Sequence, residues 1–134
     1  MDLVSSKSEV KKHIGTIDIS NALSVLQRKA FGIAVYNAYH DLKNADGGLR
    51  EMPLKVFCEL SGFNSRNYDY LNEHLKTLQK TLIEYRNEPS HFENISFFSY
   101  TSVKDGMFRY RFPPELEKIL YNPDIYARID ILVL

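Results

Sequence analysis

The apolar and polar positions change period along the chain, and the first regular stretch is helical. From Ser24 to Leu42 the apolar residues recur at helical spacing on two adjoining stripes. We therefore expect a helix that is buried on two sides. Ser24 and Gln27 have the spacing of a capping box at its start, and the loop residues Asn44 to Gly48 predict its end.

The middle of the chain predicts two further helices around a tight turn. A short extended piece at Leu49 to Met52 ends at Pro53, and a short helix is expected from Leu54 to Leu60. Ser61-Gly62 closes it, and a longer helix is expected from about Arg66 to Thr81. Two helices joined by a turn that contains glycine predict a helix-turn-helix.

The longer helix carries leucines at alternating spacings of four and three: Leu71, Leu75, Leu78 and Leu82. This spacing makes a narrow apolar seam that can pack on another helix. A seam this short inside a globular domain usually faces the domain's own core. Its alternative is a zipper-like contact between two copies of the chain.

After the third helix the period becomes that of strands. Ile83 to Arg86, the stretch from Ile95 through Phe97 to Tyr100, and Met107 to Phe112 have strand character. Asp105-Gly106 before the last strand is a strong hairpin signal. The last strand ends at Pro113-Pro114, where a helix over Glu115 to Leu120 begins.

Helix, strand, helix, helix and hairpin is the element order of a winged helix. We expect this α+β fold, with the helix-turn-helix packed on a small antiparallel sheet and the hairpin as the wing. Residues 1–18 are expected to be a flexible polar lead, and residues 19–134 the domain. The tail from Tyr126 to Leu134 becomes wholly apolar, which favours a chain that leads into a second domain.

Charge and cysteine content alter this picture only slightly. Lys and Arg number 17, as do Asp and Glu, so the formal net charge is zero. Domains that bind nucleic acid tightly usually carry a basic excess, which leaves a local basic face as the expectation. The lone Cys58 lies in an apolar stretch and predicts a buried structural thiol in a cytoplasmic protein. No segment approaches the ~20 apolar residues of a membrane span.

No catalytic or metal-binding pattern stands out. The histidines are scattered with no pair at ligand spacing: His13, His40, His74 and His91. Phosphate-binding loops of the G-x-x-x-x-G-K-[ST] kind and nucleophile elbows are missing from the sequence. Glu115 and Glu117 stand near a helix start, where they favour the helix dipole. We expect no enzyme activity, no catalytic residue, no metal and no cofactor.

The second helix of the pair carries the first group of candidate DNA contacts. In a winged helix, early residues of this helix reach base edges in the major groove. Arg and Asn side chains have the geometry to read G and A edges, and lysines further along can contact phosphates. The candidates are Arg66, Asn67, Tyr68, Lys76 and Lys80. Asp69 and Glu73 on the same helix would oppose a polyanion, so an ordinary solvated face is the alternative.

The hairpin carries the second group. Lys104 lies at its turn, and Arg109 and Arg111 are two apart on one strand face. Together they predict a compact positive ridge that rests on a phosphate backbone. The alternative is a cationic strand face that only keeps an edge soluble.

Four stretches of the sequence stand out together: Asn21 to Ala38, Tyr68 to Tyr85, Phe97 to Leu120, and Tyr126 to Leu134. In their order and spacing, they resemble the N-terminal domain of the replication initiators of iteron-bearing plasmids. The resemblance begins at about Ile19 and leaves residues 1–18 unmatched. Its motifs are diffuse but collinear.

The resemblance implies a role in the initiation of plasmid DNA replication, with two tandem winged-helix domains in the complete protein. The second domain would read the origin repeats. The first, seen here, would hold together a dimer that represses its own gene, and in the monomer would contact the far part of each repeat. Implied partners are double-stranded DNA at origin repeats, a second copy in a homodimer, and host replication proteins, with no membrane. An unrelated winged-helix regulator and a protein-interaction module without DNA contact remain as alternatives.

Overall fold

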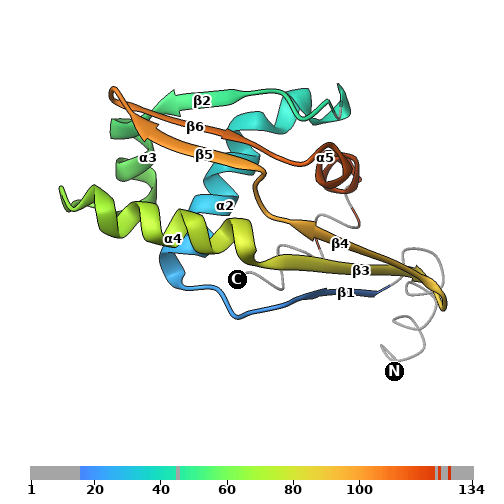
Figure 1. Cartoon of the computed structure of the whole chain (residues 1–134). Helices are drawn as coiled ribbons and strands as arrows, with labels where there is room; N and C mark the ends of the chain where they lie inside the picture. The colour runs from blue at the N-terminus through green and yellow to red at the C-terminus, as the bar shows by residue number, and fades with distance from the viewer. Residues whose placement is uncertain (1–15, 45, 123, 125–126, 128–134) are drawn as a thin grey trace.

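The computed structural model describes residues 16–44, 46–122, 124 and 127. One three-stranded antiparallel sheet, in the order β2-β6-β5, is packed against three helices, as Figure 1 shows. Its strands are β2 (Arg50–Pro53), β5 (Tyr100–Lys104) and β6 (Met107–Arg111). The helices are α2 (Val25–Ala38), α3 (Leu54–Ser61) and α4 (Tyr68–Lys80). This is the winged helix that the sequence predicts.

Helix α2 begins and packs as its sequence predicts. The Ser24 hydroxyl accepts a hydrogen bond from the Gln27 amide at 3.1 Å, and the Gln27 side chain accepts one from the Ser24 amide at 2.8 Å. The capping box is thereby confirmed. Both apolar stripes contribute buried residues, among them Ala34 from one and Phe31 from the other. The α-helix ends earlier than expected, at Ala38, and continues as a 3₁₀ segment, η1 (Tyr39–Asn44).

The helix-turn-helix is also confirmed. Gly62 closes α3 with φ of 75°, in the left-handed region that favours glycine. Asn67 caps α4, since its side-chain oxygen accepts a hydrogen bond from the Tyr70 amide at 3.1 Å. The first three seam leucines, Leu71 to Leu78, are fully buried in the domain's own core. The core interpretation of the seam is therefore confirmed, and these leucines offer no zipper to a second copy.

The wing is the hairpin of β5 and β6. Asp105 and Gly106 have φ of 54° and 72°, the pair of positive values that a two-residue type I′ turn requires. Along β6 the side chains alternate, so Phe108 and Tyr110 point into the core while Arg109 points outward. Phe108 meets Phe57 of α3 with ring centroids 4.8 Å apart, which fixes the sheet to the helix pair.

A second three-stranded sheet is the main departure from the expected single sheet. Its order is β1-β3-β4, with β1 (Thr16–Ile19), β3 (Leu82–Glu88) and β4 (His91–Ser96). β1 begins at Thr16, so the domain boundary drawn at residue 19 cuts through this strand. Strand character was expected to continue through Phe97, but Phe97 and Phe98 are both buried. Alternating strand geometry cannot bury two consecutive side chains on one face, so the chain turns here between the two sheets.

Helix α5 (Pro114–Tyr121) follows the wing and lies beside η1. It begins at Pro114 as predicted. Apart from residue 127, the apolar tail from residue 126 lies outside the described residues, as does most of the polar lead.

Candidate nucleic-acid interface

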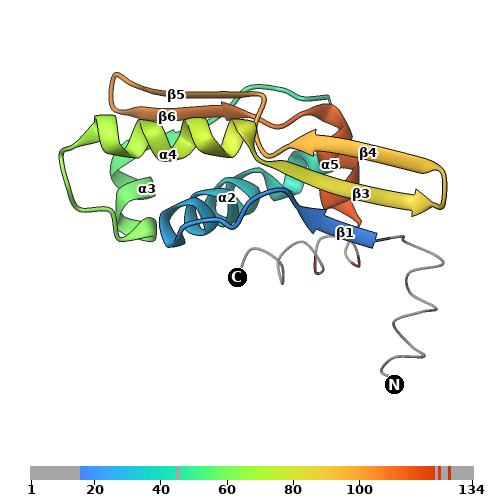
Figure 2. The same ribbon diagram turned by 60° about the horizontal axis from the view of Figure 1, so that its bottom comes forward.

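The wing turn and the start of α4 lie at the same end of the molecule. Figures 1 and 2 show the β5–β6 turn and the loop between α3 and α4 at the left in both views. The second sheet and α5 lie toward the opposite end. The fold therefore places the wing turn, next to Lys104, at the same end as the loop that carries Arg66, about 40 residues earlier in the sequence.

The outward side chains Lys104, Arg109 and Arg111 make up the wing face. Arg109 and Arg111 share one side of β6, as predicted, because Tyr110 between them is buried in the core. Lys104 and Arg111 are exposed, and neither forms an ion pair with another described residue.

Arg109 differs from Lys104 and Arg111, the other two residues of the wing face, because its side chain is already bonded to other groups of the domain. It stands directly opposite Glu51 in the β2–β6 register, and its Nε donates to Glu51 Oε2 at 3.0 Å. A second donor, Nη1, points at the backbone carbonyl of Lys104 at 3.5 Å. The Glu51 side chain is 53% exposed and that of Arg109 is 29% exposed. An ion pair this accessible to water contributes at most about 1 kcal/mol to stability.

The three candidate residues at the start of α4 differ in their exposure and in the hydrogen bonds that they already form. Arg66 is exposed in the turn before the helix. Asn67 is exposed, and its side-chain oxygen accepts a hydrogen bond as the helix cap, while its amide nitrogen can still donate to another partner. Tyr68 is 43% exposed in the first turn. The cap is a structural role that the sequence analysis missed, although an Asn immediately before a helix is its usual signal.

The lysines further along α4 are less well placed than the start of the helix. Lys76 forms an ion pair with Glu73 at 3.2 Å, one turn away on the same exposed face. Lys80 is exposed in the last turn, about 18 Å along the helix axis from Tyr68. The structure therefore groups Arg66 and Tyr68 with the wing end and leaves Lys80 apart from it.

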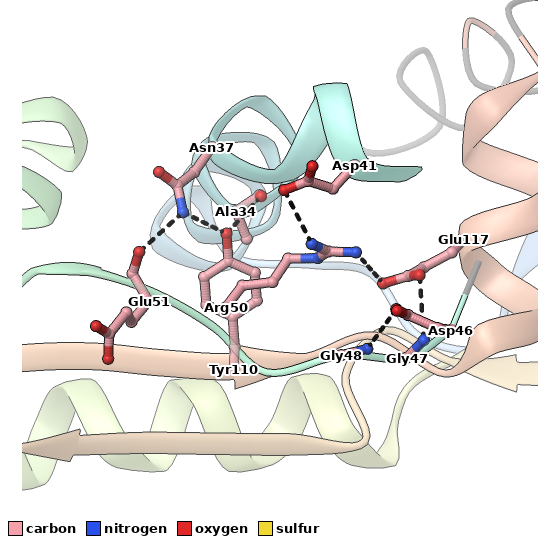
Figure 3. A network of polar contacts seen from close by, with 10 residues as sticks. All are labelled: Ala34, Asn37, Asp41, Asp46, Gly47, Gly48, Arg50, Glu51, Tyr110 and Glu117. Carbon is pink, nitrogen blue, oxygen red and sulfur yellow. Dashed lines mark hydrogen bonds and ion pairs between the residues drawn. The ribbon is translucent and has the colours of Figure 1, made fainter. Parts of the chain in front are cut away.

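Beneath the wing, a buried ion pair joins β2 to α5. Arg50, the neighbour of Glu51, points inward and donates from Nη2 to Glu117 Oε2 at 2.8 Å, as Figure 3 shows. Glu117 is fully buried, and Asp41 of η1 lies 3.5 Å from the other Nη of Arg50. The expectation that Glu117 only favours the helix dipole is incomplete, because this carboxylate is the buried partner of Arg50.

The loop before β2 supplies the rest of the shell around Glu117. The Gly47 amide donates to Glu117 Oε1 at 3.2 Å. Gly47 has φ of 67°, and a Cβ at this position would lie 2.8 Å from a side-chain carbon of Pro114. Both facts require glycine here. The loop and the start of α5 are thereby locked to each other.

Tyr110 extends this polar network to α2. Its hydroxyl donates to the Ala34 carbonyl at 2.8 Å and accepts from Asn37 Nδ2 at 2.9 Å. Asn37 also donates to the backbone carbonyl of Glu51 at 3.2 Å. Burial raises the pKa of Tyr110 to about 12, against the smaller opposing effects of Asn37 and Arg50. The hydroxyl therefore stays protonated and holds the sheet to α2.

Among residues 16–44, 46–122, 124 and 127, no group of three His, Cys, Asp or Glu side chains could hold a metal ion. Cys58 is half-buried rather than buried, packs against the core, and has a pKa raised by desolvation. That shift disfavours the reactive thiolate. Within the same described residues, no helix has the length and apolar character to cross a membrane.

Comparison with known proteins identifies the family of the chain. The family described as "Initiator Replication protein, WH1" matches residues 9–133, so the match begins ten residues before Ile19. No curated protein and no solved structure matches the chain. The family consists of DNA-binding initiators rather than enzymes. The chain therefore belongs to the initiator replication protein family, which initiates plasmid DNA replication, and the matched part is its WH1 winged helix.

Proposed function

We propose that this domain contacts the phosphate backbone at origin repeats through the wing face and the start of α4, as an auxiliary to base reading elsewhere. The observation that carries the proposal is that the wing turn, next to the exposed Lys104, lies at the same end of the molecule as the loop that contains the exposed Arg66. Phosphate contacts position a protein on the duplex and need exposed cations rather than a preformed pocket. A neutral net charge fits an auxiliary contact better than a primary one.

The individual residues take different roles in this proposal. Arg66, Asn67 and Tyr68 lie at the start of α4, where a recognition helix meets the groove. Lys104, Arg109 and Arg111 contact phosphates from the wing. Lys76 and Lys80 contribute less, because Lys76 is paired with Glu73 and Lys80 lies at the far end of the helix.

Self-association is the second part of the proposal. The domain holds a homodimer together, and the dimer represses the protein's own gene while the monomer acts at the origin. Because the seam leucines are buried, the dimer surface lies elsewhere. Edge strands carry backbone donors and acceptors that another chain can pair with. The edges of the two sheets are β1, β4, β2 and β5. Host replication proteins are further proposed partners, in the cytoplasm.

Sedimentation of the chain, followed by its titration with duplex DNA at about 50 and about 200 mM salt, tests both parts. A dimer that binds DNA weakly and with strong salt dependence supports the whole proposal. A dimer without DNA affinity supports self-association and contradicts the DNA contacts. Binding to a protein partner that persists at high salt, without DNA affinity, favours an interaction module instead.

A further inference from the structure

One carboxylate next to the wing face, that of Glu51, pairs with a cation that could otherwise bind a DNA phosphate. Glu51 lies on β2 beside Arg109, and both side chains point away from the core. The Nε of Arg109 is used by Glu51 and its Nη1 points at the Lys104 carbonyl. Arginine binds phosphate through the planar fork of these same donors. A DNA phosphate must therefore compete with groups of the domain itself.

The backbone around Glu51 is anchored to the rest of the domain by two contacts. Its backbone carbonyl accepts from Asn37 of α2. Its neighbour Arg50 is anchored on the opposite face of β2 by the buried Glu117. These contacts favour the register of β2 against β6 that sets Glu51 opposite Arg109.

Arg111 provides the internal contrast. It is exposed on the same face of β6, two residues further along, and pairs with no described carboxylate. The two arginines thus share a strand, a face and a residue type. They differ in whether an acidic side chain stands opposite: Arg109 faces Glu51, whereas Arg111 faces Tyr100 across the hairpin.

We infer that Glu51 is a built-in competitor for DNA phosphate, which pairs with Arg109 and keeps the affinity of the wing face low. This inference rests on the proposed DNA contact of the wing. It makes Glu51 a determinant of affinity rather than of folding. The remaining charged group of the hairpin, Asp105, lies at the turn and is exposed, so it adds to the acidic character of the face without a pairing role.

The test compares Glu51→Gln with the parent chain by fluorescence anisotropy on a short labelled duplex, between about 50 and about 200 mM NaCl. We expect Glu51→Gln to bind about threefold more tightly at the low-salt end, with a salt slope steeper by about one phosphate contact. The matched control is Glu84→Gln, which removes an exposed carboxylate from β3 of the other sheet and should leave binding unchanged.

A variant without Arg109 shows whether the tighter DNA binding of Glu51→Gln depends on the Glu51–Arg109 pair. In an Arg109→Ala background, Glu51→Gln should bring no further gain. A gain that persists there overturns the inference, because Glu51 would then act only through its bulk charge. Weaker or unchanged binding by Glu51→Gln also overturns it.

Arg111→Ala tests the proposed function separately. If Arg111→Ala weakens binding while Glu51→Gln does not change it, the wing contact stands and the inference that Glu51 competes with phosphate fails. If neither Arg111→Ala nor Arg109→Ala alters binding, the wing contact itself fails.

Discussion

Two adjacent residues of β2 take part in two arginine–glutamate pairs on opposite faces of one sheet. On the inner face, Arg50 meets Glu117, with side chains 10% and 0% exposed. On the outer face, Glu51 meets Arg109, with side chains 53% and 29% exposed. The nitrogen–oxygen distances are nearly equal, at 2.8 and 3.0 Å. The two pairs therefore differ in their surroundings far more than in their geometry.

Because their surroundings differ, these two pairs of the same residue types have different effects. The inner pair has lost its hydration, so removal of either partner would leave a charge buried and unpaired. The outer pair keeps much of its hydration, so it adds little to stability and its charges stay accessible to a polyanion. The inner pair fixes α5 to β2. The outer pair is the one that we propose adjusts how strongly the wing attracts DNA.

The largest expected effect is the loss of the inner pair. Glu117→Ala should lower the free energy of unfolding by about 3–5 kcal/mol, because Arg50 would stay buried beside only the exposed Asp41. Urea denaturation measures this loss. Glu51→Ala is the matched control and should change the same quantity by less than about 1 kcal/mol. Equal losses in the two variants would remove the distinction between the faces.

Tyr110 gives the next largest effect and sharpens the picture of the inner face. Tyr110→Phe deletes a buried donor to the Ala34 carbonyl and should cost about 1–3 kcal/mol. Because burial raises the pKa of Tyr110 to about 12, its contribution is fully present below the unfolded-state pKa of about 10. That contribution is lost as the pH rises from about 10 to about 12.

The pH dependence of Tyr110→Phe follows from this sign. The parent chain should lose stability across that alkaline window more steeply than the variant, as measured by thermal unfolding at a series of pH values. Tyr100→Phe, at an exposed tyrosine on the outer face of the same hairpin, is the control. Parallel profiles for the parent chain and Tyr110→Phe would contradict the buried, proton-retaining hydroxyl.

Asn67, at the start of α4, extends the comparison because it caps the helix and also lies where we propose that DNA binds. Asn67→Ala should lower stability by about 1 kcal/mol through loss of the cap. Asn67→Asp retains a capping oxygen and should leave stability unchanged. It should nevertheless weaken duplex binding in an anisotropy titration, because it places a carboxylate where we propose that DNA lies. Unchanged binding by Asn67→Asp would place the start of α4 outside the interface.

The elements that sequence predicts well are those with a local physical signal. Ser24 and Gln27 specify a cap through their spacing, and Asp105-Gly106 specifies a turn because of the positive φ values it accepts. The winged helix could be predicted because these local signals occur in the required order.

What sequence could not predict depends on long-range pairing. β1 is a strand because it pairs with β3, more than 60 residues away, and its isoleucines lie in a segment that appears polar overall. Glu117 and Arg50 are likewise 67 residues apart, and nothing near either one shows that they meet in the core. Among the candidate contacts, the alternation of Arg109 and Arg111 was readable from strand geometry. The pairing of Arg109 with Glu51 was not, since it depends on the register of β2 against β6.

The salt dependence of DNA binding by an Arg109→Ala/Arg111→Ala variant tests the central claim most directly. Each phosphate contact contributes about 0.9 to the slope of log K against log salt concentration. We predict that the double substitution makes the slope shallower by about one contact in the parent chain, where Glu51 pairs with Arg109, and by about two contacts in a Glu51→Gln background. The matched control is Lys43→Ala/Lys118→Ala, which removes two exposed cations from η1 and α5, away from the wing, and should keep the parent slope. An unchanged slope in the arginine variant, or an equal loss in the lysine control, would contradict a DNA contact made by the wing face.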